Sequence, residues 1–494
     1  MSDHVLSTRR LVTWITFLAI FAMSARVSVD SDTWWHLRAG QWIIEQRAVP
    51  QIDPFSYTRL GQPWQYPGWL VEAPMAWIFR TFGPGGLNLW TGIMVTLAFA
   101  FVWHTLSGGA FLRAFVLVLA AAASGVYWAA RPYLVTFLLA AIFLWLLECY
   151  RWQRTSRSLN GLWALPFFMV IWANSHGGFV IGFILWGVYW FAEGLSWLLP
   201  ALGRQQPLFS GRQARFVRLS LVGGLMIAAV ALNPSGLAML AYPFKTVSIG
   251  ALQEYILEWQ SPDFHLRQAQ PFIWLLLLTI AAIGASRRRL ALTDFLLVAG
   301  FTYLALLAWR NVALFALVAP AVLTRHAALP LAALGRRFDF HGASQAAPSR
   351  AQKVLNGMLL AVLILAVLFK VGMDFPLAAN QDAFRQNMPL DAVAFIKQHS
   401  PPGRLFNSYN WGGYLLWELP EYPVFIDGRT DLYNDEVIDQ WLQVVRAEAG
   451  WQQTLDNWGV RLILLEPGMP LVAHLPSAGW QLLYQDQQAV IFSR

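Results

Sequence analysis

Two aspartates stand directly after the first apolar segment of this 494-residue chain. They occur in the stretch "SVDSDTWWHLRAGQWIIEQ", where Asp30 and Asp32 precede a pair of tryptophans. Carboxylate oxygens bind hard cations such as Mg²⁺ and Mn²⁺, and a carboxylate can also serve as a general base. An aspartate just before a helix can instead cap it. Capping would account for Asp32 but would leave Asp30 unexplained.

The residues after Asp32 predict an amphipathic helix that positions this pair. Residues at the i, i+4, i+7 and i+8 spacing of one helical face are apolar, namely Trp35, Ala39, Trp42 and Ile43. The polar face carries His36 and Arg38 close to the aspartates. These two side chains are therefore candidates for the same site as the aspartates.

Composition predicts a polytopic α-helical membrane protein. The chain is 57% hydrophobic and 13% charged, and its mean hydropathy is +0.46. Its apolar runs approach the ~20 residues that cross a bilayer as a helix, and we expect about eleven spans. The single cysteine, Cys149, excludes an intramolecular disulfide, and no His/Cys cluster has the spacing of a zinc site.

Charge is unevenly distributed along the chain. Residues 374–494 hold 14 acids and 7 bases, whereas residues 1–373 hold 13 acids and 28 bases. Basic clusters between apolar runs mark cytoplasmic loops. The isoelectric point of 9.7 therefore does not indicate a nucleic-acid partner. We expect a transmembrane domain, 1–373, with a cytoplasmic N-terminus, and an extracytoplasmic α/β domain, 374–494, in a bacterial inner or plasma membrane.

The polar motifs fall on the side of the membrane opposite the arginines. The basic clusters, expected to be cytoplasmic, are at 151–157, 204–218, 287–289 and 325–353. The first outer loop, about 26–68, then shares the other side with "NSHGG", "EYILEWQSPDF" and "WRN". Four apolar runs separate Asp32 from Arg151, so one of them cannot be a full span. The run "WLVEAPMAWIFRTF" at 69–82 is the shortest and best suits an interfacial helix.

The C-terminal domain has the mixed pattern of an α/β fold. Helical patterns at 390–399 and 435–448 alternate with the short β-rich runs "YPVFID", "RLILLE", "WQLLY" and "AVIFS".

An acidic pair after the first span, opening a long outer loop, resembles the GT-C superfamily of membrane glycosyltransferases. "DSDTWWHLRAGQWIIEQ" is similar to the matching stretch of oligosaccharyltransferase catalytic subunits. "FGPGGLNLW…GGAFLRA…AARPYLVTFLLA" resembles lipid-A aminoarabinose transferases and protein mannosyltransferases. The resemblance covers roughly residues 1–160. It implies transfer from a polyprenyl-phosphate or polyprenyl-diphosphate sugar to an extracytoplasmic protein, lipid or glycan, with Asp32 as base or metal ligand and Asp30 in support.

One departure from the superfamily bears on the metal. Its members commonly carry a further acid in the second outer loop, where this chain has Arg131 in "YWAARPYLV". Either Mg²⁺ or Mn²⁺ is held by Asp30, Asp32 and residues elsewhere, or Arg131 binds the carrier phosphate without a metal. An arginine at a membrane boundary can also simply snorkel to the interface.

Two more residues are candidates for the donor phosphate. His176 stands at the start of a span that Asn174 or Ser175 could cap, and a helix N-terminus binds anions. Arg310 lies among apolar residues, where an unpaired charge is costly, so carrier phosphate, Asp32 or Glu258 is its expected partner. Glu254 and Glu258 are four residues apart and would share one face of a helix in an outer loop.

The tail offers candidates for the acceptor side. "NSYNWGGYLLWELPEYPVFIDGRTD" resembles an oligosaccharyltransferase block in which Trp-Trp-Asp-Tyr-Gly starts a helix and Asp-Gly follows a strand. The acid of that motif is missing, which argues against transfer to an Asn-X-Ser/Thr sequon. We expect the block to lie over the outer cavity near Asp32, although a glycine-rich turn into a helix is the simpler reading. Its candidate residues are Asn410, Trp411, Gly413, Tyr414, Asp427 and Arg429.

Two other functional classes remain open at this point. An oligosaccharide ligase or polymerase would use the same lipid-linked donor but depend on arginine and histidine rather than on an aspartate base. A transporter or a non-catalytic membrane scaffold would need no outward acidic site.

Overall fold

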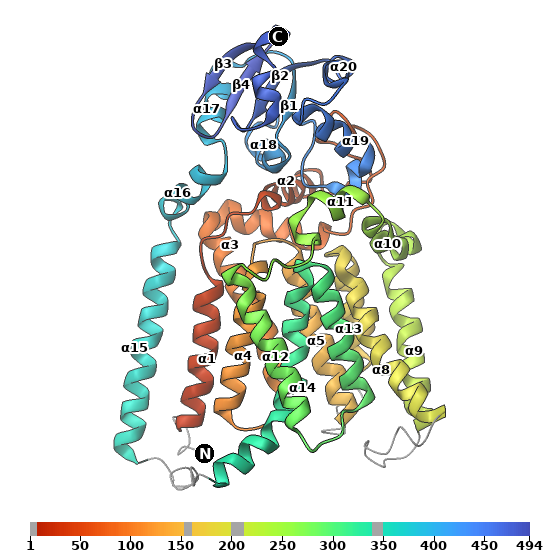
Figure 1. Ribbon diagram of the computed structural model, residues 1–494, viewed down its shortest axis with the longest axis vertical. Coiled ribbons are helices and arrows are strands. Elements are labelled where there is room, and N and C mark those ends of the chain that lie inside the picture. Colours follow the sequence, from red (N-terminus) through yellow and green to blue (C-terminus); the bar gives the residue numbers. More distant parts are fainter. Residues whose placement is uncertain (1–6, 153–160, 199–211, 338–348) are drawn as a thin grey trace.

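The computed structural model describes residues 7–152, 161–198, 212–337 and 349–494. The expected cytoplasmic arginines Arg154, Arg157 and Arg204 lie outside these ranges. The chain is a helical bundle with a C-terminal segment, containing a small sheet, at one end (Figure 1). The helices up to residue 374 are α1 (Thr8–Ser24), α2 (Ser31–Gln46), α3 (Trp69–Thr105), α4 (Ala110–Ser124), α5 (Tyr133–Trp152), α7 (Ala164–Ala173), α8 (Val180–Leu198), α9 (Arg212–Val230), α10 (Tyr242–Val247), α11 (Gly250–Tyr255), α12 (Gln270–Ala285), α13 (Leu292–Leu307), α14 (Val312–Arg337) and α15 (Arg350–Asp374).

The protein is a polytopic membrane protein by the length and apolarity of its helices. Within the described ranges, eight helices are long and apolar enough to cross a membrane. Two shorter apolar helices, α7 and α13, and the 17-residue α1 accompany them. The expected number of about eleven spans is reached only when these three shorter helices are counted with the eight, so it is approximate. Helix α15 is apolar yet almost wholly exposed, as expected of a helix that faces lipid.

Helix α3 is two helical segments joined by a kink. Gly83 adopts the left-handed conformation (φ 64°) and Pro84 follows it, so the helix cannot continue straight. The first segment, 69–82, is the run predicted to lie at the interface. The kink separates this segment from the longer apolar part of α3 that follows.

A four-stranded sheet forms the core of the C-terminal segment. Its order is β1 (Arg404–Asn407), β2 (Val460–Leu465), β4 (Val490–Ser493) and β3 (Gln481–Gln485), with β1 parallel to β2 and the other pairs antiparallel. The accompanying helices are α16 (Leu377–Asn387), α17 (Leu390–His399), α18 (Gly412–Glu418), α19 (Thr430–Val445) and α20 (Trp451–Asn457). An α/β fold was predicted for this segment and is confirmed.

The run "YPVFID", expected to be a strand, is not one. Its backbone makes a single isolated bridge, from Val424 to Ser56 in the first outer loop. The Asn407 side chain accepts a hydrogen bond from the Phe425 N–H, and the Thr58 hydroxyl donates to the Phe425 carbonyl. These side-chain and loop partners replace a neighbouring strand. The strand that sequence patterns missed is β1, four residues long.

The C-terminal segment rests on α2 and the first outer loop (Figure 1). Helix α18 comes so close to α2 that a Cβ on Gly413 would lie 2.7 Å from the Ser31 carbonyl oxygen. Arg429 is fully buried and joins Asp427 in the tail to Asp53 in the loop, at 2.6 Å from each carboxylate. Buried charges are stable only when paired in this way. The tail is thereby fixed above the start of α2.

Candidate functional site

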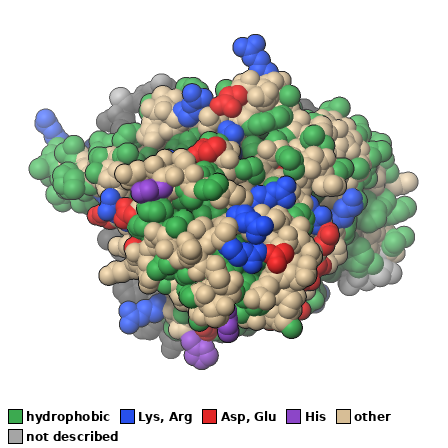
Figure 2. All heavy atoms as spheres, turned by 90° about the horizontal axis from the view of Figure 1, so that it is seen from above, with side chains coloured by type: hydrophobic (Ala, Val, Ile, Leu, Met, Phe, Trp, Pro, Cys, Tyr) green, Lys and Arg blue, Asp and Glu red, His purple; other side chains and the backbone are tan. Residues whose placement is uncertain are grey.

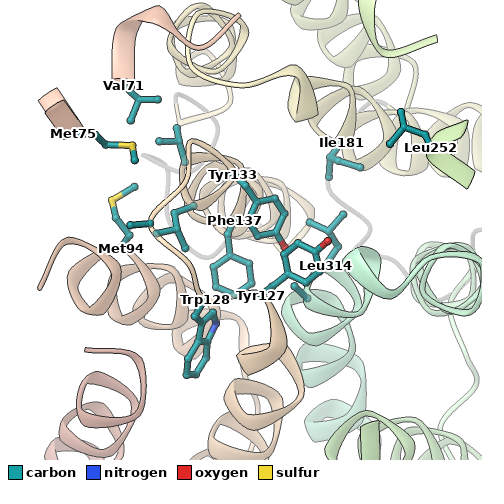
Figure 3. Packing of buried hydrophobic residues seen from close by; sticks show 14 of the residues in the cluster. Val71, Met75, Met94, Tyr127, Trp128, Tyr133, Phe137, Ile181, Leu252 and Leu314 are labelled. Carbon is teal, nitrogen blue, oxygen red and sulfur yellow. The ribbon is translucent and has the colours of Figure 1, made fainter. Parts of the chain in front are cut away.

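A cavity of about 1320 Å³ lies between the bundle and the C-terminal segment. Its lining comes from the start of α2, the turns before α5, α8 and α14, the 242–259 segment, and the start of α19. Figure 3 shows part of the buried hydrophobic packing, including Tyr127 and Tyr133, whose ring centroids are 4.6 Å apart. Segments far apart in sequence thus meet at one point.

The most highly charged part of the cavity is centred on Arg131. This guanidinium lies 2.6 Å from Asp32, 3.5 Å from Asp30 and 3.0 Å from Glu258. Arg310 approaches the other oxygen of Glu258 at 3.4 Å. We call these five residues the outer cluster. It contains three carboxylates and two guanidinium groups, and each side chain of its central pair, Arg131 and Asp32, is partly exposed to the cavity (16% and 25%).

Local structure explains how Asp30 and Asp32 are held. Asp30, not Asp32, is the N-cap of α2, and its carboxylate accepts a hydrogen bond from the Asp32 N–H. Capping, one of the two roles considered for Asp32, belongs to Asp30, because the helix begins at Ser31 rather than at Thr33. Asp32 lies in the first turn with its carboxylate directed to Arg131. The Thr33 hydroxyl donates a hydrogen bond to the Ala130 carbonyl, which holds the start of α2 beside the turn that carries Arg131.

Short turns present the other charged side chains of the cluster. Arg131 and Pro132 form the turn that precedes α5, and Arg310 lies in a 3₁₀ turn before α14. Arg310 also stacks over the Trp259 ring, 4.3 Å from its centroid. Glu258 occupies another 3₁₀ turn and accepts a hydrogen bond from the Tyr127 hydroxyl at 2.9 Å. Each charge is carried at the end of a helix or in a turn beside the cavity.

The carboxylates of the outer cluster differ in acidity. Burial raises the pKa of Asp32 to about 7, and the nearby Arg131 only partly opposes this. Burial also acts to raise the pKa of Glu258, but Arg131 and Arg310 outweigh it and hold that pKa at about 2. Asp32 can therefore exchange a proton near neutral pH, whereas Glu258 stays ionised. Neighbouring acids whose pKa values are pushed apart are typical of acid–base sites.

His176 is neutral and has a fixed tautomer. Burial, Arg310 and Arg131 lower its pKa to about 3. Its Nδ1 accepts a hydrogen bond from the Gly178 N–H at 3.0 Å and lies 2.8 Å from the Thr136 hydroxyl. The ring proton is therefore on Nε2. His176 itself caps the turn, while Asn174 and Ser175 bond back to the preceding helix, so the capping expected of these two residues was wrong.

Another part of the lining joins His36, a candidate from the sequence, to polar groups that the sequence did not single out as site residues, namely Glu72, Tyr242 and Asp431. His36 Nδ1 and Glu72 Oε1 are 2.5 Å apart, within hydrogen-bond distance, and both side chains are buried. Asp431 accepts from the Tyr242 hydroxyl at 3.0 Å, and burial raises the pKa of this aspartate. The signal for Glu72 was visible as a carboxylate inside an apolar run. We interpreted it only as a mark of the interface.

Several expected site residues lie away from the cavity. Arg38 is 3.9 Å from Glu45 on the surface of α2. Glu254 is exposed on α11 and does not share a face with Glu258, because the chain becomes extended at Ile256. The i, i+4 pairing of the two glutamates was therefore wrong.

The tail residues divide into those that line the cavity and those that brace it. Asn410 lines the main cavity, and Gly428 stands so close that a Cβ there would meet the Asp32 carboxylate. Trp411 is buried against Asn387, and Tyr414 lies edge-on to Trp34, with ring centroids 5.0 Å apart. The Asp427–Arg429 pair braces the first outer loop rather than facing the cavity.

The donor set near Asp32 does not fit a divalent cation. Arg131 lies between Asp30, Asp32 and Glu258, so its positive charge stands where a metal would have to bind. Within the described ranges, no group of three His, Cys, Asp or Glu side chains is arranged to hold a metal. No step below passes through a metal.

Comparison with solved structures identifies the fold. No protein-family model and no curated sequence matches the chain. Its structure is similar to the oligosaccharyltransferase AglB of Archaeoglobus fulgidus in complex with an inhibitory peptide and dolichol-phosphate (TM-score 0.59, 11% identity, 99% of this chain and 75% of that one). It is also similar to ArnT of Cupriavidus metallidurans bound to undecaprenyl phosphate (0.50, 14%, 99% and 98%) and to the mycobacterial arabinofuranosyltransferase AftD (0.51, 14%, 99% and 40%). The chain has the GT-C fold of these enzymes, as its sequence motifs predicted.

Proposed function

We propose that this protein is a membrane glycosyltransferase that takes a sugar from a polyprenyl-phosphate or polyprenyl-diphosphate carrier and gives it to an extracytoplasmic acceptor. The observation that carries the proposal is the outer cluster. It combines an aspartate of raised pKa with two guanidinium groups in a cavity at one end of a bundle of apolar helices. The GT-C fold supports the general class of reaction.

Arg131, Arg310 and His176 are suited to hold the carrier phosphate. Glu258 now accepts from both arginines and from Tyr127. Phosphate oxygens form the same charge-assisted hydrogen bonds with guanidinium groups, so a phosphate group can take over these donors. The Nε2–H of His176 adds a neutral donor in the same cavity. Together these groups would stabilise the negative charge that grows on the departing phosphate.

Asp32 is the proposed general base. The acceptor hydroxyl loses its proton to the Asp32 carboxylate while its oxygen bonds to the anomeric carbon of the sugar. The bond from that carbon to the phosphate oxygen breaks, and the oxygen keeps the electron pair. A base works best when its pKa lies near the working pH, as the value of about 7 for Asp32 does.

The acceptor would enter from the side of the C-terminal segment. Asn410, Gly428 and Thr430 all line the cavity and come from the tail, which is fixed above α2. Figure 2 looks down on this face, where acidic and basic side chains alternate across the top and hydrophobic ones extend beyond it at both sides. We assign this face to the extracytoplasmic side and the N-terminus to the cytoplasm, since the basic segments lie at the other end.

The test separates lipid binding from transfer. Purified protein in lipid nanodiscs is titrated with undecaprenyl phosphate and is then assayed for sugar release from polyprenyl-phosphate donors. We expect Arg131→Gln to weaken binding of undecaprenyl phosphate, and Asp32→Asn to bind it normally while losing transfer. The control is Arg38→Gln, a surface arginine of the same helix as Asp32, which should alter neither.

Two results would redirect the proposal. Full transfer by Asp32→Asn would indicate an oligosaccharide ligase or polymerase that depends on arginine and histidine. Unchanged cell-envelope glycans after gene deletion, with no lipid phosphate bound by the pure protein, would indicate a scaffold or transporter.

A further inference from the structure

One wall of the cavity carries polar and aromatic groups that the transfer step leaves unused. It is formed by Trp35 and His36 of α2, Trp64 and Tyr66 of the first outer loop, and Glu72 of α3, and we call it the aromatic wall. The rings of Trp35 and His36 are 3.5 Å apart, and those of Trp64 and Tyr66 are 4.3 Å apart. The centroids of the Trp35 and Trp64 rings are 6.4 Å apart, so the two pairs are in contact with each other. All five side chains line the cavity.

Three polar atoms of this wall are buried without a hydrogen-bond partner among the described residues. They are the Tyr66 hydroxyl, the second carboxyl oxygen of Glu72, and Trp35 Nε1. Tyr66 is 3% exposed and Glu72 is fully buried. Buried polar groups are normally paired, and leaving them unpaired lowers stability. A ligand that supplies the missing partners would remove this cost.

The chemistry of these three atoms selects the ligand. Trp35 donates, Glu72 accepts, and Tyr66 can do either, so the wall suits a group bearing several hydroxyls. Aromatic rings beside them favour the apolar C–H face of a saturated ring. A phosphate is better served by the arginines of the outer cluster, and a prenyl chain would leave all three polar atoms unpaired. A neutral polyhydroxylated ring meets both requirements.

The wall begins beside the proposed base. A Cβ built on Gly428 would lie 3.1 Å from Trp35 Nε1 and would also meet the Asp32 carboxylate. From there the wall continues through His36 to Glu72, whose Oε1 lies 2.5 Å from His36 Nδ1. A ring lying along it would have one edge at Asp32.

We infer that the aromatic wall is a sugar-binding subsite in which Trp35, Tyr66 and Glu72 hydrogen-bond the hydroxyls of a neutral sugar ring and so determine which sugar is used. The inference rests on the proposed function, since it divides one cavity into a phosphate-binding half and a sugar-binding half. The ring can belong to the donor or to a glycan acceptor, and the experiment distinguishes these sources.

The first experiment compares two lipids on full-length protein in nanodiscs. The probes are undecaprenyl phosphate and the same lipid carrying one hexose, N-acetylhexosamine or pentose. We expect the wild type to bind one of the sugar-carrying lipids more tightly than the bare lipid. Tyr66→Phe should reduce this preference about 2- to 10-fold, the range for one neutral hydrogen bond, and Glu72→Gln should reduce it further. Binding of the bare lipid should not change.

A matched tyrosine variant separates a binding role from a structural one. The Tyr57 hydroxyl donates to the Leu405 carbonyl, outside the cavity. Tyr57→Phe should therefore lower thermal stability and leave the sugar preference intact. Tyr66→Phe removes a hydroxyl that has no partner among the described residues, so it should keep or raise thermal stability while the sugar preference falls. The opposite responses of the two variants are the signature of the subsite.

The second experiment identifies which substrate brings the ring. Methyl glycosides of the same sugars are tested for binding to protein already saturated with undecaprenyl phosphate. If Tyr66→Phe weakens only the methyl glycosides, the subsite receives an acceptor glycan; if it weakens only the sugar-carrying lipid, it receives the donor sugar. If neither probe responds to Tyr66→Phe or Glu72→Gln while undecaprenyl phosphate still binds, the subsite is refuted and the proposed function stands. Failure of the wild type to bind any of the lipids would instead refute the proposed function.

Discussion

Helix α5 has a cluster of charged side chains at each end, and the two clusters differ in net charge and in exposure. The outer cluster lies at its N-terminal end. The inner cluster, about 30 Å away along a 20-residue helix, consists of Glu148, Arg151, Asp294 and Arg325. The inner residues are 2–5% exposed, and each charge is matched by an opposite one. The outer cluster has one carboxylate in excess and opens into the cavity.

The inner cluster joins three helices rather than forming a site. Asp294 of α13 lies 2.6 Å from Arg151 of α5 and 2.5 Å from Arg325 of α14. Tyr189 of α8 adds a hydrogen bond to Glu148 at 2.7 Å. These charges balance one another and are almost fully buried, so a ligand has neither access nor a net charge to bind. The comparison teaches that excess charge and access, rather than the number of charges, distinguish the proposed binding cluster from the bracing one.

The largest expected effect comes from removing the base of the outer cluster. Asp32→Asn keeps the shape of the side chain but cannot accept a proton, so the transfer rate should fall about 10²- to 10⁴-fold. Thermal stability should stay close to the wild type. Asp30→Asn is the matched control, because asparagine caps a helix equally well. An equal loss of transfer in both variants would remove the special role of Asp32.

Breaking the inner cluster should affect folding instead. Asp294→Asn leaves Arg151 and Arg325 buried beside a neutral partner, which typically costs about 3–5 kcal/mol of unfolding free energy. Unfolding of the protein in detergent measures this loss. The comparison variant is Asp374→Asn, whose partner Lys370 is exposed and which should cost no more than about 1 kcal/mol. Equal stability of these two variants would contradict a bracing role for the inner cluster.

The pH dependence of transfer should report Asp32. The ionised form is the base, so kcat/KM should fall about tenfold for each unit below pH 7 and reach a plateau above it. Glu258 and His176 have pKa values of about 2 and 3 and do not change charge in this range. Measurement of kcat/KM between pH 5.5 and 8.5 tests whether the rate falls as the pH is lowered. A rate that is flat across the range would exclude Asp32 as the titrating base.

The sequence predicted the elements of the fold better than their meeting points. Long apolar runs predict membrane spans because the bilayer core excludes most polar residues. In the tail, helical and β-rich patterns alternate along the sequence, which predicted an α/β segment. The contacts of Arg131 with Asp32 and Glu258 join residues 99 and 127 positions apart, which no local pattern encodes. Glu258 was one of three partners considered for Arg310. The helix begins two residues earlier than its apolar pattern indicated, so Asp30 caps it and accounts for the second carboxylate that capping by Asp32 had left unexplained.

A smaller effect is expected where the tail touches the outer cluster. A Cβ on Gly428 would meet the Asp32 carboxylate, which is the movable end of a side chain. Gly428→Ala should therefore shift Asp32 away from Arg131 and lower the transfer rate about tenfold, while undecaprenyl phosphate still binds. Gly468→Ala serves as the comparison, because a Cβ there would have no neighbour within 4 Å among the described residues. Unimpaired transfer by Gly428→Ala would show that the tail does not constrain Asp32.

The smallest expected effect is that of metal removal. In the outer cluster Arg131 supplies the positive charge between Asp30, Asp32 and Glu258, with its nearest contact at 2.6 Å from Asp32. A guanidinium group cannot be removed by a chelator, so transfer should persist within about twofold of the untreated rate in excess EDTA. Arg131→Ala should by contrast leave three carboxylates facing one another and abolish transfer, and Mg²⁺ or Mn²⁺ should restore part of it if a cation can take the vacated position. Loss of wild-type transfer in EDTA, reversed by Mn²⁺, would show that a metal displaces Arg131 in the working enzyme. The outer cluster would then bind a metal ion in its active form, whereas the inner cluster would remain a closed set of ion pairs between helices.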